Sequence, residues 1–548
     1  MLDPYRPSTH FRVALNSSGI HYDPLECTAA TLSVYRATGF EEEQLKLFAI
    51  GDSVSQGFMS AAAARTDLTY STLVARSMGL EIGTEYRYPE WAKDGLPLNL
   101  ERAFRRLEER YGSNIRGAEW LTVLQTLNKV VDEAEDYYER GPGAADEAYV
   151  DPARGVGGQG VGIEYFHNVA VTGFDVADSW LVTPDKCQQA IANGPGGGES
   201  FFLPNAAFYR TALKVLNPSL DPRYDDHSQL RWLEEHASNP DEGVENLILW
   251  LGANNALGTV VGLKVSQTPN DPNRRPHLLA HEQRGGWTLW HPDDFRAEYA
   301  EFLNRVDTAM RQNANPDWNV FIGTVPPVTI APLAKGVGPT YRITRKNGAT
   351  GEDETSVYYK YYVYFLFDED LVHRNDGLYL ELKDALHIDD CIREYNSAIR
   401  ALVEAKNADH RTKRYHIVDI FQMFQDIALK RNAGEVKYDF PDYFDFSYPK
   451  VDTRYYHADP DGRLRQGGLS SLDGVHPSAI GHGLLAYEFL KVMGEAGVVD
   501  NTQLDWETIF ASDRLYSEPI TIMQELYEHN WLAEKLLALI RTFRRART

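Results

Sequence analysis

Two short stretches near the ends of the chain carry residue types that could perform acyl chemistry. An apolar run from Leu45 to Ile50 stops at Gly51, Asp52 and Ser53. This pattern predicts a buried strand that ends in a tight turn, and ligands bind at the carboxyl ends of strands in open α/β sheets. Ser53 is therefore a candidate nucleophile, and the simpler alternative is a serine that caps an ordinary helix.

The candidate base lies more than four hundred residues later, where Asp473 and His476 are three residues apart on a turn. This spacing lets the carboxylate orient the imidazole, so that Nδ1 keeps its proton while Nε2 accepts one from Ser53. An Asp-capped turn and half of a metal site are the alternatives. No other cluster of histidines and acids nearby has regular ligand spacing, so no metal site is predicted.

Two further apolar runs end in residues that could donate hydrogen bonds to an oxyanion. Residues 166–173 end at Gly173, and residues 246–251 are followed by Gly252 and Asn254. The Gly173 amide and the Asn254 side chain would face the same crevice as Ser53. Ordinary strand-to-helix turns, which also use glycine and asparagine, are the alternative for both.

The elements that would position these residues can also be predicted from the sequence. Apolar runs predict strands that alternate with amphipathic helices. Strands are expected at 45–51, 166–173, 246–251, 318–325 and 415–420, and helices at 70–80, 229–236, 392–405 and 479–493. This alternation predicts an α/β fold with a parallel sheet. The small apolar run 59–64 predicts one more helix, packed on the sheet with its N-terminus toward Ser53.

Taken in order, these stretches resemble the four signature blocks of the SGNH, or GDSL, hydrolase superfamily. The blocks are Gly51-Asp52-Ser53, Gly173, Gly252-x-Asn254 and Asp473-x-x-His476. The resemblance implies a flavodoxin-like three-layer α/β/α sandwich around a parallel sheet. It also implies a GDSL-type esterase or lipase that hydrolyses carboxylic esters without a metal or an organic cofactor.

The resemblance assigns each matching residue a role. Ser53 is the nucleophile, His476 the general base and acid, and Asp473 the residue that orients His476. The amides of Ser53 and Gly173 and the side chain of Asn254 form the oxyanion hole.

The resemblance also has implications for two residues next to those with assigned roles. Asp52 stabilises the turn and is not the acid of the triad. Asn255 stands where the third block usually has Asp, which implies a local structural change and not a loss of activity.

Lipid-like or acyl-glycerol esters are the expected substrates, because the insertions contain Phe201, Phe202 and a tyrosine-rich stretch at 358–364. The tyrosine-rich stretch is a candidate wall or lid over the site, and an exposed hairpin without such a role is the alternative. A carbohydrate O-acetyl esterase and an acyltransferase are the alternative activities. A binding protein on an inactive hydrolase fold is the non-enzyme alternative, which the complete set of blocks disfavours.

The predicted hydrolase domain spans 1–500, with core strands from about residue 46. Insertions are expected near 81–162, 256–316 and 330–390, the last containing a β-hairpin around Asn347-Gly348. A C-terminal helical extension follows at 501–548. Its apolar stripe at 519–547 is expected to dock on the chain's own core, and the alternatives are a membrane surface or a second subunit.

Charge and composition narrow the range of partners. The 548 residues carry a net charge of −24, which argues against nucleic acid as the main partner. The glycine pattern at 155–160 lacks a strand before it and a helix after it, so no dinucleotide site is predicted. Cys27, Cys187 and Cys391 are widely spaced and are interpreted as buried thiols.

Neither a secretory signal nor a transmembrane segment is expected. The first thirty residues lack an apolar core, and no stretch reaches eighteen apolar residues. A cytoplasmic location is favoured, and export without an ordinary signal or a missing presequence are the alternatives.

Overall fold

The computed structural model describes residues 45–528 with internal gaps. The gaps are 64, 92–94, 141–162, 194–205, 272, 274, 366, 368, 374–376, 449, 459–463 and 501–502. Several predictions lie outside the described residues, namely those for Cys27, the glycine pattern at 155–160, Phe201, Phe202 and the stripe beyond 528.

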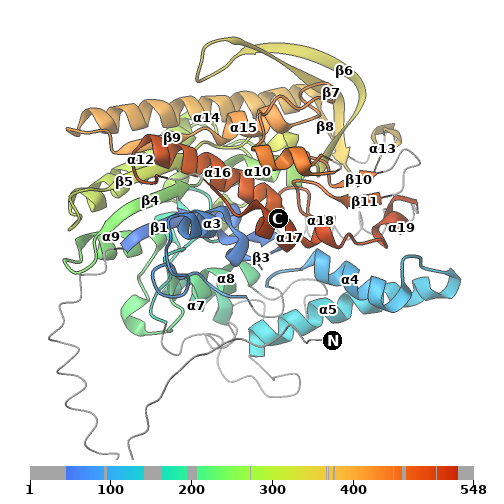
Figure 1. Cartoon of the computed structure of the whole chain (residues 1–548), viewed down its shortest axis with the longest axis horizontal. Coiled ribbons are helices and arrows are strands. Elements are labelled where there is room, and N and C mark those ends of the chain that lie inside the picture. Colours follow the sequence, from blue (N-terminus) through green and yellow to red (C-terminus); the bar gives the residue numbers. More distant parts are fainter. Residues whose placement is uncertain are drawn as a thin grey trace, which may run out of the picture. The chain divides into compact units, whose positions relative to one another are not determined.

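In the described part of the chain, four strands form one parallel sheet (Figure 1). They are β1 (Leu45–Gly51), β4 (Val244–Trp250), β5 (Asn319–Gly323) and β9 (Tyr415–Val418), in that spatial order. The register places Ala49 opposite Ile248 and Ile248 opposite Phe321. The fold is therefore mixed α/β with a parallel sheet, as predicted, and four of the five expected strands belong to this sheet.

The fifth expected strand, at 166–173, lies along the free side of β1 without forming a regular ladder. The backbone N–H of Ala49 donates to the His167 carbonyl, and the N–H of Val169 donates to the Ala49 carbonyl. The Gln229 side chain stands in for the next ladder bond, because its amide donates to the carbonyls of both Gly51 and Val169. This stretch extends the sheet edge next to the candidate nucleophile.

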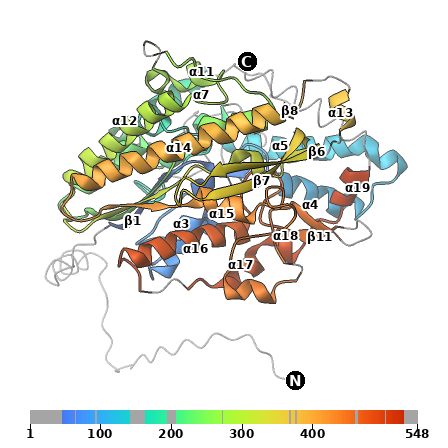
Figure 2. The same cartoon turned by 90° about the horizontal axis from the view of Figure 1, so that it is seen from above.

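Apolar side chains cover both faces of the sheet, which is typical of a parallel sheet between helices. In β1, Phe48 and Ile50 belong to one apolar cluster, and Leu47 and Ala49 belong to another on the opposite face. Figure 2 shows α12 and α14 on one side and α3 and α16 on the other. The helices over the first face are α9 (Gln229–Ser238), α12 (Pro292–Arg311) and α14 (Leu382–Ala408), and those over the second are α3 (Tyr70–Ser77), α15 (Ile420–Ile427) and α16 (Ala479–Glu495).

The helix predicted at 59–64 is wrong. A one-turn helix, α2 (Ser53–Gln56), ends at Gly57, whose φ of 87° is left-handed. The short strands β2 (Phe58–Met59) and β3 (Ala62–Ala63) then form a hairpin whose turn residues, Ser60 and Ala61, also have left-handed φ angles of 51° and 66°. Hydrogen bonds from this turn to residues 471–473 outweigh the local helix propensity.

The insertion after the hairpin contains a pair of helices, α4 (Leu100–Tyr111) and α5 (Trp120–Arg140). Residues from the C-terminal part of the chain pack against this pair, since Ile520 and Ile522 are buried in one apolar cluster with Leu107. The Thr521 N–H also donates to the Glu108 carboxylate over 2.7 Å. The beginning of the predicted tail stripe therefore docks on the chain itself.

The predicted β-hairpin around residues 347–348 is confirmed as β6 (Ala334–Lys346) and β7 (Asp353–Tyr364), with β8 (Leu380–Glu381) beside β7. Of the tyrosines at 358–364, which were a candidate wall or lid over the site, Tyr358, Tyr362 and Tyr364 are buried in the core and Tyr359 and Tyr361 are partly exposed. Tyr358 and Tyr362 are fully buried, and the Arg431 guanidinium lies 4.0 Å from the Tyr358 ring centre.

Other described elements complete the layers around the sheet. They are α6 (Asp178–Leu181), α7 (Pro184–Asn193), α8 (Ala207–Leu216), α10 (Asn254–Val261), α11 (His281–Arg284), α13 (Asp370–His373), α17 (Trp506–Ser512), α18 (Arg514–Ser517), α19 (Met523–Glu528), β10 (Tyr456–Ala458) and β11 (Leu464–Gly467). None of the described helices is both long and apolar enough to cross a membrane. Cys187 and Cys391 are buried free thiols, as predicted.

Candidate active site

Ser53 is the first residue of α2, directly after β1, and only 4% of its surface is exposed. Asp52 caps this helix, because its carboxylate accepts the Val54 N–H. Gly51 is required for the close turn, since a Cβ there would lie 2.2 Å from the Ser55 hydroxyl. The helix N-terminus thus begins at the candidate nucleophile itself, so the simpler alternative of a capping serine does not describe Ser53.

His476 connects Ser53 with Asp473 through two hydrogen bonds. Its Nε2 lies 2.9 Å from the Ser53 hydroxyl, and its Nδ1 lies 2.9 Å from the Asp473 carboxylate. With the proton on Nδ1, Nε2 is the acceptor for the serine proton. The Phe58 ring covers the imidazole, with the ring centres 4.6 Å apart.

Asp473 is held by the backbone as well as by His476. One carboxylate oxygen accepts the N–H groups of Val475 and His476, and the other accepts the Ala61 N–H over 2.8 Å. Burial alone would raise the pKa of Asp473, but His476 and these N–H donors lower it below its ordinary value. The carboxylate is therefore ionised and fixed in position at neutral pH.

The loop between the two triad candidates has no room for a larger residue at Gly474. Its φ is 65°, and a Cβ there would lie 1.6 Å from the Tyr455 hydroxyl. The Gly474 carbonyl also accepts the Leu333 N–H at the base of the β6–β7 hairpin. The insertion at 330–390 thus supports the loop that carries Asp473 and His476.

Gly173 and Asn254 lie beside the turn that holds Ser53. The N–H of Val171 donates to the Gly51 carbonyl, which brings the Gly173 turn to the end of β1. The Asn254 amide donates to the Phe174 carbonyl over 2.8 Å and, more weakly, to the Asp52 carboxylate over 3.4 Å. Gly173 has a φ of 79°, so its turn favours glycine.

Asp52 has an unusual electrostatic environment. Burial raises its pKa to about 7, although the Val54 N–H and the charge of His476 oppose this rise. The proton population of Asp52 therefore changes near neutral pH, next to Asn254.

A buried ionic cluster lies behind Gly173 and was not predicted. The Arg284 guanidinium contacts the carboxylates of both Asp175 and Asp178, and His281 donates to Asp178 over 2.9 Å. Burial and the charge of Asp178 raise the pKa of Asp175 to about 7. These groups fix the turn that carries the Gly173 amide.

The same cluster continues to Asn255. Glu298 accepts the Asn255 side-chain N–H over 2.5 Å and the Ala177 N–H over 3.0 Å. Burial and Asp175 raise the pKa of Glu298 well above its ordinary value. Asp175 and Asp178 follow Gly173 in the chain, so the sequence could have indicated that they lie near the site. Arg284 and Glu298 belong to no motif in the sequence and could not have been found in this way.

The arrangement supplies a hydroxyl, a base to deprotonate it and N–H donors near the same strand ends. In the described ranges, no group of three or more His, Cys, Asp or Glu residues could hold a metal ion.

A scan against protein-family models finds no match to this chain, and a search of curated proteins also finds none.

Proposed function

We propose that this chain is a serine ester hydrolase of the SGNH type. The observation that carries this proposal is the hydrogen-bonded series Asp473, His476 and Ser53 at the carboxyl end of β1. Both hydrogen bonds are 2.9 Å long, within the range expected for a nucleophile and its general base.

The strand order lends support to the family proposal. If the stretch at 166–173 is counted beside β1, the five segments follow the spatial order 2-1-3-4-5 of flavodoxin-like sheets. Ligands in such sheets bind where the order reverses, between the first and third strands. Ser53 and Asn254 follow these two strands, β1 and β4.

In the proposed reaction, Ser53 Oγ attacks the ester carbonyl carbon while His476 Nε2 takes the hydroxyl proton. The carbonyl oxygen becomes negative and is stabilised by the amides of Ser53 and Gly173 and by Asn254. Asn254 would exchange its long contact with Asp52 for the oxyanion. The imidazolium then protonates the leaving alcohol, and water cleaves the acyl-enzyme by the same steps.

We propose lipid-like or acyl-glycerol esters as substrates. The buried tyrosines of the hairpin no longer support this choice, but two other aromatic residues flank the site. Phe58 covers His476, and Phe208 lies close enough to Gly173 that a Cβ there would meet its ring at 3.3 Å. These rings favour an apolar acyl group over a charged one.

Hydrolysis of p-nitrophenyl esters from acetyl to long acyl chains tests the proposal. We expect turnover in the wild-type protein that increases from acetyl to longer chains, and a loss of about 10³-fold or more in Ser53→Ala and in His476→Ala. Ser238→Ala, an exposed serine on α9, serves as the matched control and should keep full activity. Equal turnover in Ser53→Ala and wild type would refute the assignment, and a preference for acetyl would favour the O-acetyl esterase alternative.

A further inference from the structure

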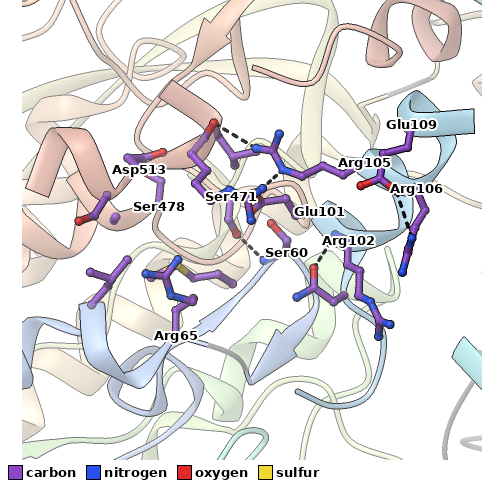
Figure 3. Close-up of a pocket in the computed structure, with 17 residues that line it drawn as sticks. Ser60, Arg65, Glu101, Arg102, Arg105, Arg106, Glu109, Ser471, Ser478 and Asp513 are labelled. Atoms are coloured by element: carbon purple, nitrogen blue, oxygen red, sulfur yellow. Dashed lines mark hydrogen bonds and ion pairs between the residues drawn. The ribbon is translucent and has the colours of Figure 1, made fainter. Parts of the chain in front are cut away.

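A cavity of about 330 Å³ is lined in part by Ser471 and Ser478, which flank Asp473 and His476 in the sequence (Figure 3). Ser53 and His476 do not line it. Its walls come from α4, the segment 59–68, the segment 471–479 and the segment 512–515. The insertion and the C-terminal part of the chain thus meet the hydrolase core at this cavity.

The lining of the cavity is basic, although the chain as a whole is acidic. Lysine and arginine number 55 in the chain against 79 aspartates and glutamates. The cavity is instead lined by five arginines and three acids, which are Arg65, Arg102, Arg105, Arg106, Arg514, Glu101, Glu109 and Asp513. Three of these arginines also pair with acids outside the lining, namely Arg65 with Asp67, Arg102 with Glu133 and Arg514 with Glu518.

Several of the guanidinium groups have donors beyond those used in the protein. Arg106 donates to Glu109 through Nη1, and Arg65 donates to Asp67 through Nε and Nη2. Because a guanidinium has five N–H groups, each of these side chains has further donors. Among the described residues, the ion pairs of Arg514 are long, 3.7 Å to Glu101 and 3.9 Å to Glu518.

The acids in the lining are already engaged. Glu101 accepts Arg105 Nε over 2.8 Å, and the buried Asp513 accepts the backbone N–H groups of Ile480 and Tyr516. Ser60 and Ser471 also line the cavity, and their hydroxyls accept the N–H groups of Leu472 and Ser60. Figure 3 shows the arginines of α4 across the cavity from Ser478 and Asp513.

We propose that this cavity binds the phosphate group of a small phosphate monoester. Guanidinium groups match phosphate oxygens in geometry and charge, and donors from separate walls suit a tetrahedral anion better than a planar carboxylate. The volume accommodates a phosphate with a short organic body. This inference concerns binding and goes beyond the proposed ester hydrolysis.

The cavity is also connected to the triad candidates through the backbone. The Ser60 N–H donates to the Ser471 hydroxyl over 2.9 Å, and the next residue, Ala61, donates to Asp473. An anion beside Ser60 therefore lies one residue from a hydrogen bond that holds the Asp473 carboxylate.

Isothermal titration calorimetry of the full chain with inorganic phosphate and with glycerol 3-phosphate tests the proposal, and glycerol is the uncharged control. We expect saturable binding of either phosphate at a single site and no binding of glycerol. The double variant Arg106→Gln/Arg514→Gln should weaken this binding by about tenfold or more, since two charge-assisted contacts are lost. Arg231→Gln should have no effect, because Arg231 forms a similar exposed pair with Glu234 outside the cavity.

Sedimentation with phosphatidylcholine vesicles, with and without phosphatidate, distinguishes a lipid headgroup from a soluble ligand. Binding of phosphatidate vesicles alone, lost in the double variant, would support the same phosphate site with a lipid source. If the double variant does not fold, Arg65→Gln on the opposite wall replaces it. The absence of binding at millimolar phosphate and on phosphatidate vesicles, or equal binding by the double variant, would overturn the proposal whether or not the chain hydrolyses esters.

Discussion

The carboxylate of Asp473 accepts hydrogen bonds from three backbone N–H groups and from His476, so both of its oxygens are in use. An amide in its place would direct an NH₂ group at an N–H donor or at the Nδ1 proton. The residue therefore fixes the loop and the histidine tautomer together, and its two roles cannot be separated by this substitution.

Asp473→Asn should accordingly lower kcat for p-nitrophenyl esters by about 10³- to 10⁴-fold, as expected when the wrong histidine tautomer is stabilised. Steady-state kinetics and circular dichroism together check this. A correctly folded variant with less than a tenfold loss would show that Asp473 does not orient His476.

Substitutions of the adjacent residues Asn254 and Asn255 should have separable effects on turnover and on stability. Asn254→Ala should lower kcat by roughly 10²- to 10³-fold with little change in KM, which is typical for one oxyanion donor. Asn255→Asp should leave kcat nearly unchanged but lower the unfolding free energy, since Asn255 donates to the buried Glu298. Kinetics and urea unfolding of both variants test this, and a reversal of the two effects would assign the donor to Asn255.

The residues proposed to react were predictable from sequence because each lies in a short motif after a strand or before a helix. The groups that position them were not. Ala61 donates to Asp473 across 412 residues of sequence, and Arg284 contacts Asp178 across 106. Only the folded chain brings such pairs together, and no periodic pattern in the sequence indicates them.

At the level of elements, the turn between β2 and β3 departs from regular secondary structure. Ser60 and Ala61 both have left-handed φ angles, which cost residues other than glycine about 1 kcal/mol or more. Hydrogen bonds to residues 471–473 offset this cost, and the same long-range contacts explain why local propensity predicted a helix here. The strands were predicted more reliably, because their fully apolar runs follow from burial on both faces.

Glycine substitutions at Ala61 and Ala62 should therefore affect the free energy of unfolding differently. Ala61→Gly should leave stability unchanged or raise it by up to about 1 kcal/mol, because glycine adopts the left-handed region without strain. The neighbouring control, Ala62→Gly, should lower stability by about 0.5–1 kcal/mol, since Ala62 is a buried strand residue with an ordinary φ. Urea unfolding measures both, and a larger loss for Ala61→Gly than for Ala62→Gly would contradict the described turn.

For the whole molecule, the buried acids predict a dependence of stability on pH. The pKa of Asp175 is raised to about 7, from an ordinary value of 3.8. Between these values Asp175 keeps a proton in the folded chain that it releases in the unfolded chain, so its contribution to stability falls as pH rises. Asp52 acts in the same direction. The lowered pKa of Asp473 acts in the opposite direction at lower pH, and the buried His416 and His482, whose pKa values burial lowers to about 4 and about 3, act in the opposite direction up to about pH 6.5.

Urea unfolding from about pH 5 to pH 7 measures the contribution of Asp175 as a difference between the wild type and a variant. The free energy of unfolding of Asp175→Asn should fall less steeply, or rise more steeply, with pH than that of the wild type, by up to about 1.4 kcal/mol per pH unit, the contribution of one proton. Asp317→Asn, at an aspartate whose side chain is 95% exposed, should leave the slope unchanged. The same slope in Asp175→Asn and wild type would show that Asp175 is not protonated in the folded chain.

The central claim, that Ser53 is a nucleophile activated by His476, is tested most directly by covalent labelling with a fluorophosphonate. Mass spectrometry of the full chain and of its peptides locates the adduct. We predict one phosphonyl group on Ser53, formed slowly in His476→Ala and not formed at this position in Ser53→Ala. An unlabelled wild-type chain, or a label on another residue with Ser53 unmodified, would contradict the claim.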